Sequence, residues 1–189
     1  MENALATGLK GQFLLAMPGL NDPNFEKSVT CMSEHTPQGA LGIVVNRVHS
    51  AISVKDICQE LKIECREDLA GVPVHIGGPV HINEIFVLHG APFGWEGCLP
   101  VTDEIALSNT LDILKAIGCG DGPSAYLISL GCAGWGPSQL EGEIMQNAWL
   151  TTPASAETIF QVPVENRWET AVRSMGIDPS LLTDTAGHA

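Results

Sequence analysis

The residue types best suited to chemistry meet in segment 129–137, where Cys132 stands among glycines. An apolar stretch before it predicts a strand, and Pro137 suits the first turn of a helix. Cys132 is therefore expected at a strand–turn–helix junction, where the helix dipole stabilises a thiolate nucleophile. Leu130 breaks the small–x–nucleophile–x–small pattern of a nucleophile elbow. The glycines equally predict a tight turn that presents Trp135.

Polar side chains on the predicted helix after this turn offer partners for Cys132. Glu141 has the chemistry of a general base, and Gln139 could bind a ligand. Acids in a first helical turn also complement the dipole, so a purely structural role stays open. His89, at the end of another predicted strand, is the alternative base.

A second candidate surface combines a strand end with a glycine turn. Asn46 and Arg47 end a predicted strand and could receive an anion or a carboxylate, although an exposed turn is an equal alternative. The complete set of predicted ligand-binding residues is Asn46, Arg47, Gly77, Gly78, His89, Gly134, Trp135, Gln139 and Glu141, and Cys132 is the candidate nucleophile.

Signatures of metals and cofactors are missing from the sequence. His75, His81 and His89 surround a glycine turn, with Cys58 and Cys65 upstream, but their spacing fits no zinc site. The chain also lacks a phosphate-binding P-loop and a dinucleotide-binding glycine motif. We therefore expect neither a metal nor a cofactor.

The charge balance restricts the possible partners. The net charge is −13, from 9 Lys and Arg against 22 Asp and Glu, and the basic residues are scattered. Because nucleic-acid affinity depends on neutralising phosphates, direct DNA binding is disfavoured, and so is binding to an anionic membrane. Charged residues make up only 16% of the chain, which predicts an efficient core or an apolar patch buried against another subunit.

The cysteines and the N-terminus predict a cytoplasmic protein. Six scattered cysteines without a C-x-x-C pair indicate reduced thiols rather than a disulfide framework. The N-terminus resembles no secretory signal, and no apolar run is long enough to span a membrane.

The elements that must position these residues are short and irregularly ordered. Expected strands are 13–17, 28–33, 39–46, 72–76, 84–88 and 124–130, and expected helices are 54–61 capped by Ser53, a helix capped by Ser108 or Asn109 and ended by Gly118, 137–147, and 165–175. About seven strands and four helices without regular alternation predict an α+β fold. We expect one domain over 1–189, with a core from about 11 to 176 and short tails.

Several separated segments together resemble the YqgE/AlgH family. They are Phe13-Leu14-Leu15-Ala16-Met17-Pro18, Asp22-Pro23, Phe25, Ser28-Val29, Gly39 through Arg47, Gly77-Gly78-Pro79-Val80, Leu88-His89, Leu130-Gly131, Ala133-Gly134-Trp135-Gly136, Gln139-Leu140-Glu141, Glu143-Ile144, Asn147, Trp149 and Arg167-Trp168. The resemblance implies a bacterial cytosolic protein with a small barrel-like, partly antiparallel sheet flanked by helices. Family members are often labelled transcriptional regulators, and no catalytic residue is settled for them. The family frequently has an aromatic residue where this chain has Cys132, which weakens the thiol hypothesis.

Three functional hypotheses follow. The first is a non-catalytic regulatory or binding protein that acts through an unknown protein or small-molecule partner, and that could also form a homo-oligomer. The second is a hydrolase-type or thiol-dependent enzyme that uses Cys132 with His89 or Glu141. The third is a direct DNA-binding regulator, which the charge disfavours.

Overall fold

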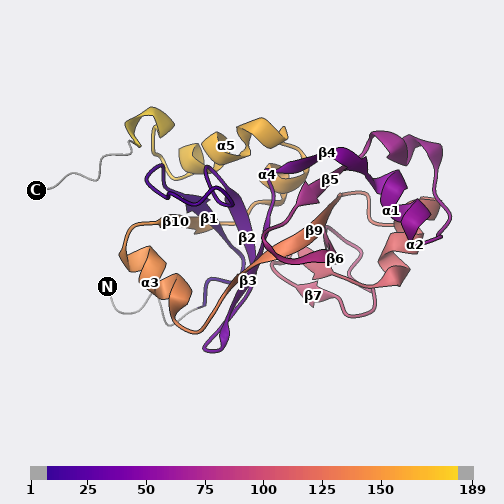
Figure 1. Cartoon of the computed structure of the whole chain (residues 1–189), viewed down its shortest axis with the longest axis horizontal. Helices are drawn as coiled ribbons and strands as arrows, with labels where there is room; N and C mark the ends of the chain where they lie inside the picture. The colour runs from indigo at the N-terminus through magenta and orange to yellow at the C-terminus, as the bar shows by residue number, and fades with distance from the viewer. Residues whose placement is uncertain (1–7, 183–189) are drawn as a thin grey trace, which may run out of the picture.

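One curled sheet runs through the structure, a computed structural model that describes residues 8–182 (Figure 1). In that range the strands are β1 (Gln12–Ala16), β2 (Val29–Thr36), β3 (Gly39–Val44), β4 (Val48–Ser53), β5 (Pro73–Ile76), β6 (Val80–His89), β7 (Leu99–Pro100), β8 (Ala106–Ser108), β9 (Tyr126–Trp135) and β10 (Trp149–Pro153). The α-helices are α1 (Val54–Glu60), α2 (Leu111–Cys119), α3 (Gln139–Met145), α4 (Ala156–Phe160) and α5 (Arg167–Ser174).

The long strand β9 organises the sheet. The hydrogen-bonded order is β10-β1-β2-β3-β9-β6-β8-β7, and β5 joins β9 and β4 outside this path. Along one edge of β9, the first half pairs in parallel with β5 and the second half pairs antiparallel with β3. The sheet therefore forks along β9, and the two arms are visible on either side of this strand in Figure 1.

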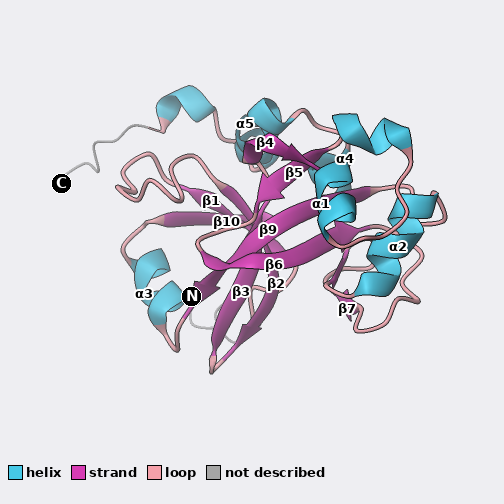
Figure 2. Cartoon of the chain, turned by 45° about the vertical axis from the view of Figure 1, so that its right-hand side comes forward, coloured by secondary structure: helices cyan, strands magenta, loops and turns pink. Residues whose placement is uncertain are grey.

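Helices cover the sheet at separate places and give three apolar clusters (Figure 2). Helices α1 and α2 close one cluster over β5, β6 and β9 through Ile57 and Ile113. Helices α4 and α5 close the largest cluster over β1 and β2, where Trp168 is buried. Helix α3 inserts Leu140 beside Trp149 in the third. An α+β single domain with a curled, mainly antiparallel sheet is thus confirmed. The short tails were expected before about residue 11 and after about residue 176, and their outer parts, residues 1–7 and 183–189, lie outside the described residues.

The helix at Ser53 confirms its sequence signal. The Ser53 hydroxyl accepts a hydrogen bond from the Asp56 N–H, and the Asp56 carboxylate accepts one from the Ser53 N–H, which is a reciprocal capping box. The expected boundaries of the second helix are wrong by one or two residues at each end. Thr110 is its N-cap and Gly120, at φ 89°, ends it, whereas the expected terminator Gly118 lies inside the helix.

The expected strand–turn–helix junction at Cys132 is wrong. Strand β9 continues from Tyr126 to Trp135, and α3 begins only at Gln139. Gly131, at φ 74°, introduces a local irregularity without ending the strand, because Cys132 and Ala133 still pair with β6 and β3. A glycine-rich segment that local rules assign to a turn is held extended by strands on both edges.

Short strands account for most of the elements that the sequence did not reveal. Strands β4, β7, β8 and β10 and helix α4 were not expected, and each has six residues or fewer. Within residues 8–182, no helix is both long and apolar enough to cross a membrane.

Candidate functional site

Cys132 lies in the core and not at a reactive junction. Its side chain is 1% exposed and packs in the largest apolar cluster. Burial, with a smaller contribution from the Glu84 carboxylate, raises the pKa of the Cys132 thiol to about 11. Such a thiol remains protonated near neutral pH and is a poor nucleophile.

His89 is far from Cys132. Because β6 and β9 are antiparallel, His89 pairs with Tyr126, and Cys132 lies six positions further along β9. At about 3.3 Å per residue the separation is roughly 20 Å. The buried His89 ring contacts the Ser108 hydroxyl at 3.0 Å and the Gly90 carbonyl at 2.7 Å, and burial lowers its pKa. A Cys132–His89 dyad is incompatible with this geometry.

Trp135 is part of a closed aromatic cluster. It is 6% exposed, and its ring centroid lies 5.9 Å from those of Phe25 and Trp149. One Glu143 oxygen, Oε2, accepts hydrogen bonds from both indole N–H groups, at 2.9 Å from Trp135 and 2.8 Å from Trp149. The other oxygen accepts one from the Gln139 amide at 2.9 Å. The Trp135 indole is therefore held by contacts within the protein and is almost wholly buried.

The sequence did not predict that Phe25, Glu143 and Trp149 complete this cluster. The signal present was the i, i+4 spacing of Gln139 and Glu143, which places both on one helical face. Gln139 also accepts a hydrogen bond from the Gly136 N–H through Oε1, so both ends of its amide are engaged.

Glu141 and Gly134 lie outside the carboxylate–indole network. The Glu141 carboxylate is 3.1 Å from Nε2 of His35, which connects α3 to β2. Gly134 is exposed, and a Cβ atom at its position would lie 3.5 Å from a methyl group of Val80. Neither residue contacts Cys132 through a hydrogen bond.

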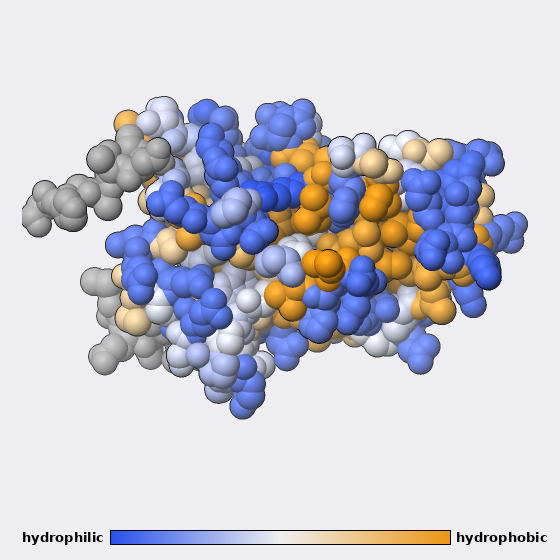
Figure 3. Space-filling view, viewed as in Figure 1, coloured by the Kyte–Doolittle hydropathy of each residue, from blue (hydrophilic) through white to orange (hydrophobic). Residues whose placement is uncertain are grey.

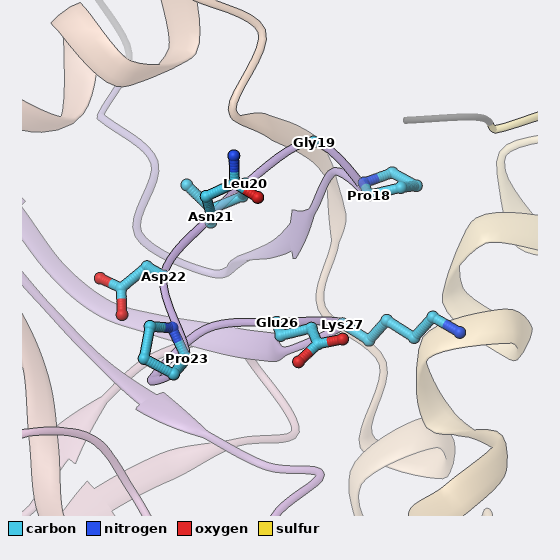
Figure 4. Close-up of a pocket in the computed structure, with 8 residues that line it drawn as sticks. All are labelled: Pro18, Gly19, Leu20, Asn21, Asp22, Pro23, Glu26 and Lys27. Carbon is cyan, nitrogen blue, oxygen red and sulfur yellow. The ribbon is translucent and has the colours of Figure 1, made fainter. Parts of the chain in front are cut away.

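Asn46 and Arg47 hold a loop that follows β1. Arg47 donates hydrogen bonds to the carbonyls of Pro23 and Glu26. The Asn46 side chain donates a hydrogen bond to the Lys27 carbonyl and accepts one from the Val29 N–H. The loop encloses an open hollow in which the Asp22 and Lys27 side chains point apart (Figure 4). The guanidinium is occupied by backbone carbonyls, which explains its position without an anionic ligand.

The glycines at 77, 78 and 131 allow two strands to cross in close contact. A Cβ on Gly77 would lie 2.1 Å from the Gly131 carbonyl oxygen, and one on Gly78 would lie 2.3 Å from the Cys132 carbonyl. Gly77 also donates a backbone hydrogen bond to Leu130, and its carbonyl accepts one from Val44. These glycines fix the fork of the sheet beside Arg47, whose carbonyl accepts from Ile76.

A buried Arg167–His75 pair joins α5 to the same fork. The Arg167 guanidinium bonds the carbonyls of Val162 and Val45, and one of its nitrogens is 3.3 Å from Nε2 of His75. Burial and the neighbouring positive charge lower the pKa of His75 to about 4. His75 is therefore neutral at physiological pH, which suits its place beside a cation.

The predicted site residues thus divide into three separate places. Asn46, Arg47, Gly77 and Gly78 meet at the fork, Trp135, Gln139 and Glu141 lie near α3, and His89 lies at the far end of β6. In the described range, no group of three or more His, Cys, Asp or Glu side chains is arranged to hold a metal ion.

An open apolar groove lies between α1 and the start of β6. Ile52, Ile57, Leu61, Ile82, Ile85 and Leu130 line it together with Asp56, Glu60 and Asn83, and it encloses about 490 Å³. Apolar surface gathers over α1, β4, β5, β6 and β9 (Figure 3). Around this groove, Val48, Ile76 and Val80 are 37–40% exposed and Ile82 is 62% exposed.

An irregular start of β6 creates the groove. Val80 pairs with Cys132 and Ile85 with Leu130, so five steps along β6 correspond to two along β9. The extra residues bulge outward, His81 has a positive φ of 50°, and Ile82 is carried onto the surface. No pattern in the sequence predicted this groove. The only local signal was the apolar face of the helix that contains Ile57 and Leu61.

The fold places this chain in the class of α+β proteins with one curled, mainly antiparallel sheet. Residues 13–180 match the family model described as AlgH-like (DUF179). A UPF0301 protein of Desulforapulum autotrophicum is 48% identical over 181 residues, covering 96% of both chains. One from Thioalkalivibrio sulfidiphilus is 44% identical, covering 97% of this chain and 98% of its own. The chain belongs to the AlgH-like family.

Solved structures agree with this assignment. The solution structure of the AlgH protein from Pseudomonas aeruginosa has a TM-score of 0.81 and 41% identity, and the similarity covers 100% of both chains. The crystal structure of a Corynebacterium diphtheriae protein has a TM-score of 0.72 at 21% identity, covering 92% of this chain and 89% of its own, and shares the fold.

Proposed function

We propose that this protein is a non-catalytic binding protein whose α1–β6 groove receives an apolar, positively charged segment of a partner protein. The observation that carries the proposal is the exposed Ile82 side chain in the wall of the groove, with exposed Val80 on the same strand and exposed Ile76 paired with the lining residue Leu130. Large exposed apolar patches on a protein surface commonly mark interaction sites. Because this patch extends beyond the groove, it suits a protein segment better than a compact small molecule.

Charge complementarity specifies the partner. The two charged residues that line the groove are Asp56 and Glu60. Hydrogen bonds from the Ser53 hydroxyl and backbone N–H lower the pKa of Asp56, so its carboxylate stays ionised. The net charge of −13 adds a long-range attraction for a basic partner. An amphipathic helix with one apolar face and flanking lysines would satisfy both features.

The same charges disfavour the other possible occupants. A second copy of this chain would bring another acidic rim and another −13 charge to the interface, so a homo-oligomer through the groove is disfavoured. DNA would meet the same repulsion. We propose that any regulatory effect of this protein results from binding a basic partner protein in the cytoplasm.

A thiol enzyme at Cys132 is not favoured. Cys132 is buried in a strand, its pKa is raised, and neither His89 nor Glu141 forms a hydrogen bond with it. Thiol catalysis requires an accessible thiolate.

A model peptide tests the proposal. We expect a fluorescently labelled amphipathic helical peptide of leucine and lysine to bind the full chain at low salt, measured by fluorescence anisotropy. The matching leucine–glutamate peptide should not bind. Ile82→Ser should weaken binding about tenfold or more, because it removes apolar contact area from the rim. Glu60→Gln should weaken binding a few fold and reduce its salt dependence.

Met145→Ser is the matched control. Met145 is 73% exposed on α3 and does not line the groove, so this variant should bind the lysine peptide like the parent chain. The proposal fails if the lysine peptide does not bind, if the glutamate peptide binds equally well, or if both serine variants weaken binding equally. Sedimentation of the chain alone, showing a dimer that Ile82→Ser dissociates, would also overturn it.

A further inference from the structure

Three of the six cysteines lie in or beside helices α1 and α2, although the sequence contains no C-x-x-C pair. Cys58 is on the inner face of α1, Cys65 is in the loop that follows it, and Cys119 is the last residue of α2. The loop folds back on the two helices through hydrogen bonds from the Ile63 N–H to the Cys58 carbonyl and from the Arg66 N–H to the Gly118 carbonyl, both at 3.0 Å.

Gly118 permits this convergence. A Cβ atom at that position would lie 2.2 Å from the Glu64 carbonyl oxygen and 3.9 Å from Sγ of Cys58. The absence of a side chain lets the loop lie directly on the end of α2, with Cys58 beneath it.

Cys65 packs against the apolar cluster that contains Cys58, and its thiol donates a hydrogen bond to the Arg66 carbonyl at 3.5 Å. Burial and, to a smaller extent, the neighbouring Cys65 and Cys119 thiols raise the pKa of Cys58 to about 12. Cys58 is 2% exposed, whereas Cys65 is partly exposed and Cys119 is exposed. The Cys119 sulfur is directed toward the Glu64 carboxylate, 4.0 Å away. An oxidant from solvent therefore reaches Cys65 before Cys58.

We propose that Cys58 and Cys65 form an oxidation site at which hydrogen peroxide converts the two thiols into an intramolecular disulfide. The inference is independent of the proposed groove function. Cys65 is the first sulfur to react and Cys58 is the resolving sulfur. Cys58 is in a helix and Cys65 is in the irregular loop that follows it. Movement of this loop can bring the two sulfur atoms to bonding distance.

The two steps balance. In the first, the Cys65 thiolate attacks one peroxide oxygen, an S–O bond forms, the O–O bond breaks and hydroxide leaves and takes up a proton as water. In the second, the Cys58 sulfur attacks the sulfenic sulfur, the S–S bond forms and the S–O bond breaks. The departing hydroxide takes the Cys58 proton and leaves as water. Two thiols are oxidised and one peroxide is reduced to two waters.

Peptide mapping of the full chain after treatment with hydrogen peroxide tests the inference. We expect a Cys58–Cys65 cross-link that dithiothreitol reverses, while the buried Cys31 and Cys132 remain thiols. Cys65→Ser should abolish the cross-link, and Cys119→Ser should leave it unchanged. In Cys58→Ala, dimedone should trap Cys65 as the sulfenic acid.

Three outcomes would overturn the inference. They are a cross-link that joins Cys65 to Cys119 instead, oxidation of Cys65 directly to the sulfinic acid in the parent chain, and resistance of Cys65 to peroxide while Cys119 is oxidised. If Cys58→Ala does not fold, the comparison of Cys65→Ser with Cys119→Ser still decides the question, because neither thiol is buried in the core.

Discussion

The two regions that β9 connects cover their apolar side chains in different ways. Near Trp135, two indoles and Phe25 pack together, and Glu143 accepts both indole N–H groups, so the cluster is closed and its polar atoms are paired. Near Leu130, the side chains of Ile82 and Val80 stay on the surface beside a groove with acidic residues. The residues most conspicuous in the sequence serve the core, and the inconspicuous isoleucines form the candidate binding surface.

The glycine crossing between the two regions should be the most sensitive position. Gly77→Ala would place a Cβ atom 2.1 Å from the Gly131 carbonyl oxygen, so the strands must separate. We expect a loss of about 3–4 kcal/mol in the free energy of unfolding, measured with urea. Gly142→Ala is the control, because nothing lies within 4 Å of its added Cβ and alanine favours the helix by up to about 1 kcal/mol. Equal stability of the two variants would contradict the tight crossing.

The closed region should depend on one carboxylate. Glu143→Ala leaves the indole N–H groups of Trp135 and Trp149 without their acceptor, and we expect a loss of about 2–3 kcal/mol in the free energy of unfolding. Glu143→Gln keeps one acceptor oxygen and should lose less. Glu141→Gln, on the same helix, tests whether any acid on α3 has this effect. A loss from Glu141→Gln as large as that from Glu143→Ala would refute the special role of Glu143.

The buried His75 predicts how stability depends on pH. Its pKa is lowered from 6.5 to about 4, so the unfolded chain binds the proton more tightly than the folded one. Stability from this residue is therefore complete above pH 6.5 and falls as the pH drops toward 4. The expected loss is about 2 kcal/mol between pH 6.5 and roughly pH 4.5. Urea unfolding across this range should show a flatter profile for His75→Gln, and an unchanged profile would remove His75 as the cause.

The open region should tolerate substitution with the smallest effect on stability. Ile82→Ser should change the free energy of unfolding by no more than about 0.5 kcal/mol, because the Ile82 side chain is 62% exposed. Circular dichroism during thermal unfolding measures this effect. A loss comparable to that from Glu143→Ala would show that Ile82 is part of the core, and would remove the contrast between the two regions.

Local signals predicted the elements that are stabilised locally. The N-cap at Ser53 and the apolar runs of β1, β2 and β3 were readable from the sequence, and they agree with the observed α+β fold. The family resemblance was also contained in the sequence and is confirmed. Strands such as β7 and β10 were not predicted, because a few residues acquire a strand conformation only from the neighbours with which they pair.

By itself, the sequence determined the fold class, the family and the acidic charge, because composition and periodicity express burial and charge directly. Only the tertiary structure decided what segment 129–137 does. It showed that β3, β5 and β6 hold these glycines extended, that Cys132 is buried, and that His89 is roughly 20 Å away along β9. It also brought Ile82 beside α1 and packed Cys65 against the apolar cluster that contains Cys58. Contacts of this kind join residues through strand register and loop folding, which no local pattern encodes.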